Sequence, residues 1–234
     1  MVQPSDNVEF GPKPGPEPLF QLTGQDLGYG SQAVLKQLHL SIHAGEKVAL
    51  LGPSGSGKST LLRKLYHQQR HRCALLPQQL GLVEVLSVFH NIYMGRLSQR
   101  SALYNLFNLI SPRPEPVTQI RSLAESLGIE SLLWRSVDSL SGGQQQRTAL
   151  GRALYQNCQL FIGDEPVSSV DPFRAESMLS LINQQHQTVV VALHDREQAL
   201  SHFDRIIGLS RGRIVLDQPC SELEPQQLAA IYRS

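Results

Sequence analysis

The stretch Gly52-Pro53-Ser54-Gly55-Ser56-Gly57-Lys58-Ser59-Thr60 constrains this chain more than any other. Its glycines let the backbone turn N–H groups inward around an anion, because no Cβ stands in the way. Lys58 can place a charge on the outer phosphates of a nucleotide, and Ser59 can offer a hydroxyl to Mg²⁺. The preceding run Lys47–Leu51 predicts a strand, and Leu61–Tyr66 predicts a helix whose positive end faces the phosphates. The stretch therefore predicts a phosphate-binding loop.

Length and composition narrow the class of protein. With 234 residues the chain can bury a full core, as one large α/β domain or two small ones. Its net charge of +1 and lack of a long basic run give no reason to expect nucleic acid as a partner. Cys73, Cys158 and Cys220 are too scattered for a disulfide framework or a zinc site. No apolar run approaches the roughly 20 residues of a spanning helix, so we expect a soluble chain or one that docks onto a membrane component.

The pattern along the chain alternates strands with helices. Residues 1–18 are polar and proline-rich, which predicts a flexible tail without a secretory signal. Strands are expected at Phe20–Thr23, Leu38–Ile42, Gln159–Gly163, Thr188–Leu193, Ile206–Leu209 and Arg213–Leu216. Helices are expected at Val85–Leu109, Val117–Leu127, Pro172–Asn183 and Glu197–His202, with a break at Pro112, Pro114 and Pro116. This order predicts a mostly parallel sheet with a helical insertion between its first and second core strands.

Two acidic residues end one of the buried strands. Asp164 and Glu165 follow the apolar run Gln159–Gly163 directly, so they should face the same crevice as the phosphate-binding loop. Asp164 suits the shell of a Mg²⁺ ion, which prefers oxygen ligands. Glu165 suits a general base that orients water for in-line attack on a γ-phosphate.

A second anion-receiving turn occurs at Ser141, Gly142, Gly143 and Gln144. An apolar stripe at Ala149, Leu150, Ala153 and Leu154 predicts a helix after it, whose N-terminus would face an anion. Because one loop already encloses a triphosphate, this turn should serve a nucleotide held by another copy of the chain.

In this context, the run Leu140-Ser141-Gly142-Gly143-Gln144 resembles the signature of ABC-transporter ATPase domains, and the family's other motifs follow in the expected order. The resemblance covers the chain from about Leu19 onward. It implies a P-loop NTPase fold, the ABC cassette, with a mostly parallel core sheet, an antiparallel β-subdomain and a helical subdomain at about 79–148. Residues 19–234 would form this single ATPase domain, with ATP and Mg²⁺ as its ligands.

The resemblance also implies roles for single residues. Tyr29 resembles the aromatic residue that stacks on adenine, and Gln78 the glutamine that contacts Mg²⁺ and senses the membrane subunits. Gln79 is the alternative, but Gln78 directly follows the strand-like run Ala74–Leu76 and Pro77. Asp171 ends a segment, 168–171, similar to the loop that crosses the dimer interface. His194 matches the switch histidine on the γ-phosphate.

Two features depart from the family pattern. Only Leu61–Pro77 separates the phosphate-binding loop from Gln78, where the family usually has several extra strands. We therefore expect a reduced antiparallel β-subdomain. Gly151 lies inside the signature helix, where it costs roughly 1 kcal/mol relative to alanine.

The function implied is the ATP-hydrolysing subunit of an ABC importer. Segments 86–97 and 231–234 and the glutamines at 144–146 are similar to phosphonate-importer ATPases, so a phosphorus oxyanion is the expected substrate class. Amino-acid importers, export or lipoprotein-release systems, non-transport ABC ATPases and a degenerate nucleotide-binding module are the alternatives. The expected partners are a second copy in a head-to-tail dimer, integral-membrane permease subunits and a substrate-binding protein. The expected location is peripheral, on the cytoplasmic face of the inner membrane.

Overall fold

The computed structural model describes residues 17–29 and 32–232, so the predicted tail lies almost wholly outside the described residues. The strands are β1 (Phe20–Tyr29), β2 (Gln32–Ile42), β3 (Lys47–Leu51), β4 (Cys73–Leu76), β5 (Leu160–Asp164), β6 (Thr188–Ala192), β7 (Arg205–Ser210) and β8 (Arg213–Pro219). The α-helices are α1 (Lys58–Gln69), α2 (Val88–Tyr93), α3 (Ala102–Ile110), α4 (Pro114–Ser126), α5 (Gly142–Tyr155), α6 (Pro172–Gln185), α7 (Arg196–His202) and α8 (Pro225–Ala230). Short 3₁₀ helices are η1 (Met94–Gln99), η2 (Glu130–Leu132), η3 (Val137–Ser139) and η4 (Cys220–Glu222).

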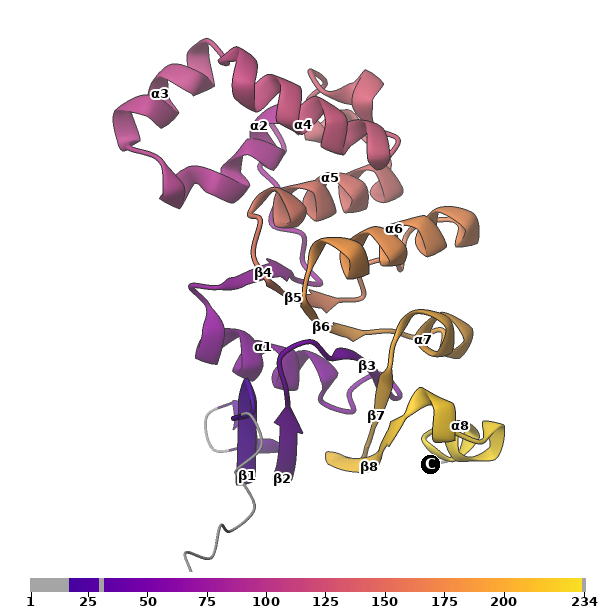
Figure 1. Cartoon of the computed structure of the whole chain (residues 1–234). Coiled ribbons are helices and arrows are strands. Elements are labelled where there is room, and N and C mark those ends of the chain that lie inside the picture. Colours follow the sequence, from indigo (N-terminus) through magenta and orange to yellow (C-terminus); the bar gives the residue numbers. More distant parts are fainter. Residues whose placement is uncertain (1–16, 30–31, 233–234) are drawn as a thin grey trace, which may run out of the picture.

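The core is a six-stranded sheet in the order β4-β5-β6-β3-β7-β8. All neighbouring strands run parallel except β7 and β8, which are antiparallel, so the prediction of a mostly parallel sheet is confirmed. The β1–β2 hairpin forms a separate two-stranded sheet. Figure 1 shows this hairpin at the opposite end of the molecule from α2, α3 and α4, with β4, β5, β6 and β3 between them.

Both faces of the central sheet are covered at β3, β5 and β6, and this explains why these strands are nearly continuous apolar runs, whereas the edge strand β8 alternates in exposure. In β3, Val48 and Leu50 pack into a cluster with α1 and the β1–β2 hairpin. Ala49 and Leu51 point to the other face and pack into a cluster with α2, α4, α5 and α6. The strand is therefore buried on both sides, and the phosphate-binding loop leaves a rigid part of the core.

The β1–β2 hairpin is longer than the sequence pattern predicts. The strands expected at Phe20–Thr23 and Leu38–Ile42 are only the parts of β1 and β2 far from the turn, and the pairing continues to Tyr29 and Gln32. Register shifts occur between Thr23 and Gly28, and they interrupt the alternation of apolar and polar residues. The strict period of two is lost there, which is why the middle of each strand was missed. This hairpin is the reduced antiparallel β-subdomain that the short segment after α1 predicts.

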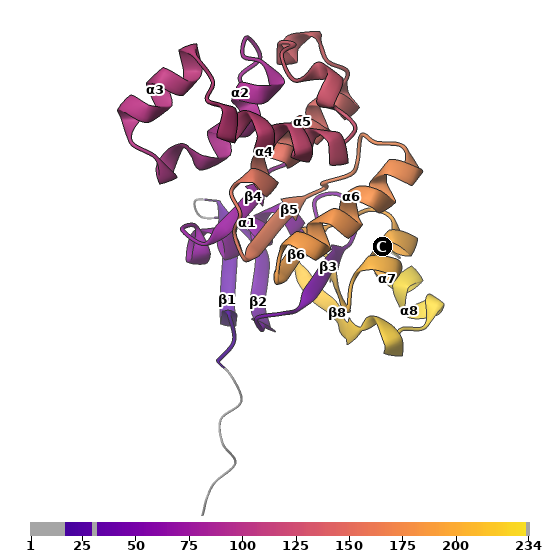
Figure 2. The same cartoon turned by 45° about the horizontal axis from the view of Figure 1, so that its top comes forward.

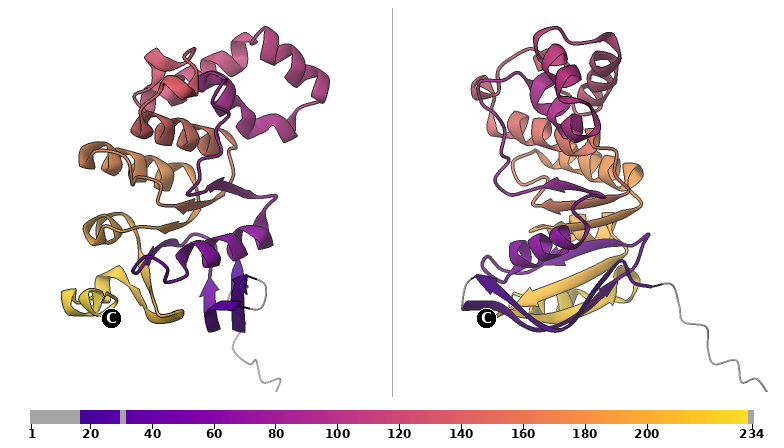
Figure 3. Two further views of the ribbon diagram at one scale, coloured as in Figure 1. Left: turned by 180° about the vertical axis from the view of Figure 1, so that it is seen from behind. Right: turned by 90° about the vertical axis from the view of Figure 1, so that its left-hand side faces the viewer.

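The helical insertion lies between β4 and β5, at the end of the molecule farthest from the hairpin (Figures 2 and 3). The prediction that it separates the first and second core strands is wrong, because β4 joins the sheet beside β5. The prolines also act differently from the prediction, since α4 begins at Pro114 and includes Pro116 in its first turn. Proline is tolerated there because the first N–H groups of a helix need no intrahelical partner.

Two glycines allow the helical insertion to approach α5 closely. A Cβ on Gly151 would lie 3.0 Å from Ile92 Cδ1 of α2 and 3.2 Å from Leu127 Cδ1 at the end of α4. A Cβ on Gly95 in η1 would lie 2.3 Å from the carbonyl oxygen of Arg152 in α5. The glycine that weakens α5 as an isolated helix thus removes side-chain bulk where three elements pack.

Gly95→Ala is expected to lower the free energy of unfolding by about 1–3 kcal/mol, because the new methyl group overlaps backbone that cannot rotate away. Urea unfolding followed by circular dichroism measures the change. Gly142→Ala is the matched control, since its Cβ would meet no atom of the described residues within 4 Å. Equal unfolding midpoints for Gly95→Ala and the unchanged protein would contradict this account of the packing.

Candidate active site

The phosphate-binding loop joins β3 to α1 as the sequence predicts. Gly52, Gly55 and Gly57 have φ angles of 152°, 76° and 106°, in the region that disfavours residues with a Cβ. Lys58 is the first residue of α1 and is only 6% exposed. Its Nζ donates hydrogen bonds to the carbonyl oxygens of Gly52 (2.7 Å) and Pro53 (3.1 Å). The loop therefore binds the ammonium group of Lys58 through two of its own carbonyl oxygens.

Burial disfavours the charged form of this lysine. Desolvation lowers the pKa of Lys58, while the nearby carboxylates of Glu165 and Asp164 oppose that shift. Additional negative charge beside a buried ammonium group stabilises its charged form. The environment of Lys58 thus favours an anionic ligand.

A cavity of about 360 Å³ opens beside the loop. It brings together parts of the chain that are more than 100 residues apart, and it is lined by Val34, Ser54, Gly55, Gly57, Lys58, Ser59, Thr60, Gln78 and Glu165. Gln78 is among these residues and Gln79 is not. Val34 belongs to β2, so the short hairpin forms part of the wall.

Asp164 ends β5 and is 8% exposed. Its Oδ1 is buried and has no hydrogen-bond partner among the described residues. Desolvation raises the pKa of Asp164, and a hydrogen bond with the Ser59 side chain works against that shift. A buried carboxylate oxygen left without a partner, next to a hydroxyl, fits a hard cation that takes oxygen ligands.

Glu165 is held in an unusual backbone conformation with a φ of 55°. Its N–H donates to the carbonyl oxygen of Ala192 (3.1 Å), and its own carbonyl accepts from Gln146 Nε2 (3.0 Å). Its carboxylate Oε1 lies 2.6 Å from His194 Nε2. Positive φ is rare outside glycine and is found where surrounding contacts impose it, often at functional sites. These contacts direct the Glu165 side chain into the cavity.

Gln146 is a contributor that sequence reasoning did not single out. It lies in α5, is 5% exposed, and connects that helix to the backbone of Glu165. The only available signal was its place in the glutamine run after Gly143, and that run gives no hint of which glutamine turns inward.

The signature turn 141–144 and Asp171 do not line this cavity. Ser141 and Gln144 form a capping box at the N-terminus of α5, with Ser141 N–H donating to Gln144 Oε1 (2.9 Å). Asp171 caps α6 by accepting from Arg174 N–H (3.1 Å). Tyr29 is the last residue of β1, and its side chain is outside the described part of the structure.

Comparisons with known proteins agree with this fold. A family model described as "ABC transporter" matches residues 35–168. Proteins named "Phosphonates import ATP-binding protein PhnC" are 36% identical in Anaeromyxobacter dehalogenans, over 95% of this chain, and 38% identical in Thiobacillus denitrificans, over 85%. This chain spans 50% of the first protein and 86% of the second.

Solved structures of ABC transporter cassettes also match this chain. The "Dimeric Structure of MJ0796, a Bacterial ABC Transporter Cassette" matches with a TM-score of 0.70 and 26% identity, over 86% of this chain and 98% of that one. A post-hydrolysis dimer of the same cassette, bound to ADP and Pi, has a TM-score of 0.68 at 26% identity, over the same shares of both chains. The chain belongs to the ABC transporter family. It is an ATP-binding cassette, and cassettes of this family hydrolyse ATP.

Asp164→Asn is expected to stabilise the nucleotide-free protein at pH 7. The folded-state pKa of Asp164 is raised, so its ionised form is disfavoured on folding and costs stability wherever the carboxylate is charged. The gain should be full above that raised pKa, shrink as the pH falls through it, and vanish below the ordinary pKa of aspartate, where Asp164 is protonated in both the folded and the unfolded state. Urea unfolding at several pH values measures it, with Asp138→Asn at an exposed position as the control. A gain that grows on acidification would contradict the assignment.

Proposed function

We propose that this chain is the ATP-hydrolysing subunit of an importer for phosphonates or related phosphorus oxyanions, which it powers through separate membrane subunits. The observation that carries the catalytic part is the Glu165–His194 contact of 2.6 Å beside a cavity that Lys58 also lines. The substrate class rests on relatives named as phosphonate importers at 32–38% identity. Amino-acid importers and export or lipoprotein-release systems remain the alternatives.

The residues of the cavity take separate roles in this proposal. The loop Gly52–Thr60 holds the phosphates through its N–H groups, and Lys58 neutralises charge on the outer ones. Glu165 accepts the proton of the attacking water, and His194 holds that carboxylate in place and contacts the γ-phosphate. Ser59, Gln78 and Asp164 would hold Mg²⁺, which would offset the charge that develops on the phosphate oxygens. Tyr29 would stack on adenine.

A second copy of the chain would complete each site. The Ser141–Gln144 turn is the N-terminus of α5, and its Ser141 and Gly142 are exposed. Such a terminus attracts phosphate, yet it does not line the cavity of its own chain. In a head-to-tail dimer it would close over the nucleotide of the partner, and segment 168–171, including Asp171, would cross between the two sites.

The partner in the membrane would dock on the helical subdomain, which we place at about 79–148 of a single cassette spanning 19–234. An apolar groove of about 460 Å³ lies there between α2 and α3, lined in part by Leu86, Met94 and Leu109. Nearby Leu103, Phe107 and Ile110 are 70%, 64% and 78% exposed. A groove of this kind suits an amphipathic helix from a permease. No helix among the described residues is long and apolar enough to cross a bilayer. Bound to such a permease, the chain would sit peripherally on the cytoplasmic face of the inner membrane.

Glu165→Gln is expected to bind ATP but to lose hydrolysis by at least about 10²-fold, since the general base is gone while the phosphate contacts remain. Its closed dimer should then persist. Phosphate release and size-exclusion chromatography with ATP measure the two effects. Lys58→Ala is the control that should neither hydrolyse ATP nor dimerise. A Glu165→Gln variant that stays monomeric with ATP would overturn the two-copy site.

Cells that carry this chain with its permease and binding protein are expected to take up a labelled alkylphosphonate. Phe107→Asp should reduce that uptake by about tenfold, because a charge enters the apolar docking surface. ATP hydrolysis by the isolated chain should be unchanged, and Glu125→Ala, on the exposed side of α4, should transport normally. Uptake of an amino acid and not of the phosphonate would contradict the proposed substrate class. Normal phosphonate uptake by Phe107→Asp would contradict the proposed docking surface.

A further inference from the structure

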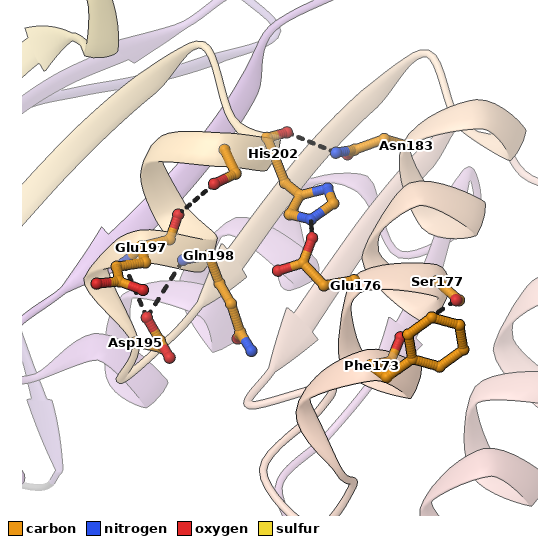
Figure 4. Close-up of polar contacts among 9 residues, drawn as sticks. Phe173, Glu176, Ser177, Asn183, Asp195, Glu197, Gln198 and His202 are labelled. Atoms are coloured by element: carbon orange, nitrogen blue, oxygen red, sulfur yellow. Dashed lines mark hydrogen bonds and ion pairs between the residues drawn. The ribbon is translucent and has the colours of Figure 1, made fainter.

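A second histidine–carboxylate contact lies outside the cavity, between α6 and α7. His202 is the last residue of α7, and its Nε2 lies 2.5 Å from Glu176 Oε2 on α6. The carbonyl oxygen of His202 also accepts a hydrogen bond from Asn183 Nδ2 (2.6 Å), farther along α6. Figure 4 shows the imidazole of His202 pointing across the gap between the two helices toward Glu176. The C-terminal end of α7 is therefore anchored to α6 at two points.

The position of this contact in the chain relates it to the site. The segment 165–176 carries Glu165 at one end and Glu176 at the other, and the segment 194–202 carries His194 and His202. Glu165 meets His194 at 2.6 Å and Glu176 meets His202 at 2.5 Å, so two like contacts join the same two segments. The loop 168–171 lies between the two glutamates.

Both segments are stiff enough to transmit a displacement. Asp195 caps α7 by accepting from the N–H groups of Glu197 (2.8 Å) and Gln198 (3.2 Å), directly after His194. Asp171 caps α6 in the same way, directly after the loop. An α-helix rises about 1.5 Å per residue, so the seven residues of α7 span about 10 Å. A shift at His202 is therefore passed along α7 to the neighbourhood of His194.

The contact itself adds little to the stability of the fold. The His202 side chain is 11% exposed, but that of Glu176 is 52% exposed. Ion pairs with such a solvated partner contribute little to the free energy of unfolding. A purely structural role would thus leave hydrolysis almost unchanged when the contact is removed.

We propose that Glu176 and His202 are positioning residues, which fix α7 against α6 so that His194 meets Glu165 while loop 168–171 stays aligned with the site. This inference rests on the proposed roles of Glu165 and His194. Neither residue lines the cavity beside the phosphate-binding loop, and the pair acts only through the two capped helices.

The test uses the full chain and steady-state ATP hydrolysis. Glu176→Ala and His202→Ala are each expected to lower kcat by about tenfold, because small misplacements of reacting groups are costly. KM for ATP should stay within about twofold, since the loop that binds the ground-state phosphates is untouched. The kcat of the double variant should be no lower than that of either single variant, because the two substitutions remove the same contact. Glu176→Gln should recover most of the activity, as its amide oxygen still accepts from the imidazole N–H.

Glu130→Ala is the matched control, because it removes a comparable carboxylate, 41% exposed and 3.1 Å from Arg121, and should keep the unchanged kcat. Normal kcat in Glu176→Ala, or additive losses in the double variant, would overturn the proposal. Glu176 is half-exposed, so its two variants decide the matter even if His202→Ala does not fold. Glu165→Gln is measured beside them. If it hydrolyses ATP normally the proposed function fails, whereas its inactivity with a normal Glu176→Ala refutes only the positioning role.

Discussion

The meeting of parallel strand ends at one edge of the sheet is the constraint on which the site depends. Leu50 of β3 and Asp164 of β5 both pair with Ala192 of β6, so β6 places the ends of its two neighbours at the same level. The loop after β3, the acids that end β5 and the histidine after β6 must then converge. Burial of these strands on both faces keeps that edge rigid.

The electrostatics of the site follow from this convergence. Burial disfavours the charged forms of both Lys58 and Asp164, lowering the pKa of the lysine and raising that of the acid. A polyphosphate would bring negative charge to Lys58, and the proposed cation would bring positive charge to Asp164, so binding would relieve a cost that folding creates. Glu165 and His194 are less buried, with side chains 19% and 48% exposed, and they form a hydrogen bond with each other.

Helix α5 connects packing contacts far from the cavity to the site. Gly95 and Gly151 let the helical insertion lie close to that helix. The same helix carries Gln146 to the carbonyl of Glu165 and presents the Ser141–Gln144 turn at its exposed N-terminus. The helical insertion is thus connected through α5 to the backbone of Glu165 and to the surface that a second copy would use. This arrangement suits a protein whose hydrolysis is tied to movement of a membrane partner.

The sequence by itself determined the central strands, the phosphate-binding loop, the Asp164–Glu165 pair, His194 and the signature turn, because each depends on local residue types at fixed spacing. It failed where local pattern is interrupted or silent: in the bulged middle of β1 and β2, in the first turn of α4 with its prolines, and in the place of β4. Only the tertiary structure brought Glu165 to His194, chose Gln146 from a run of glutamines, explained Gly151, and set His202 against Glu176. Those relations join residues that are distant in the chain, and a side chain's own neighbours in sequence carry no information about which distant group it will meet.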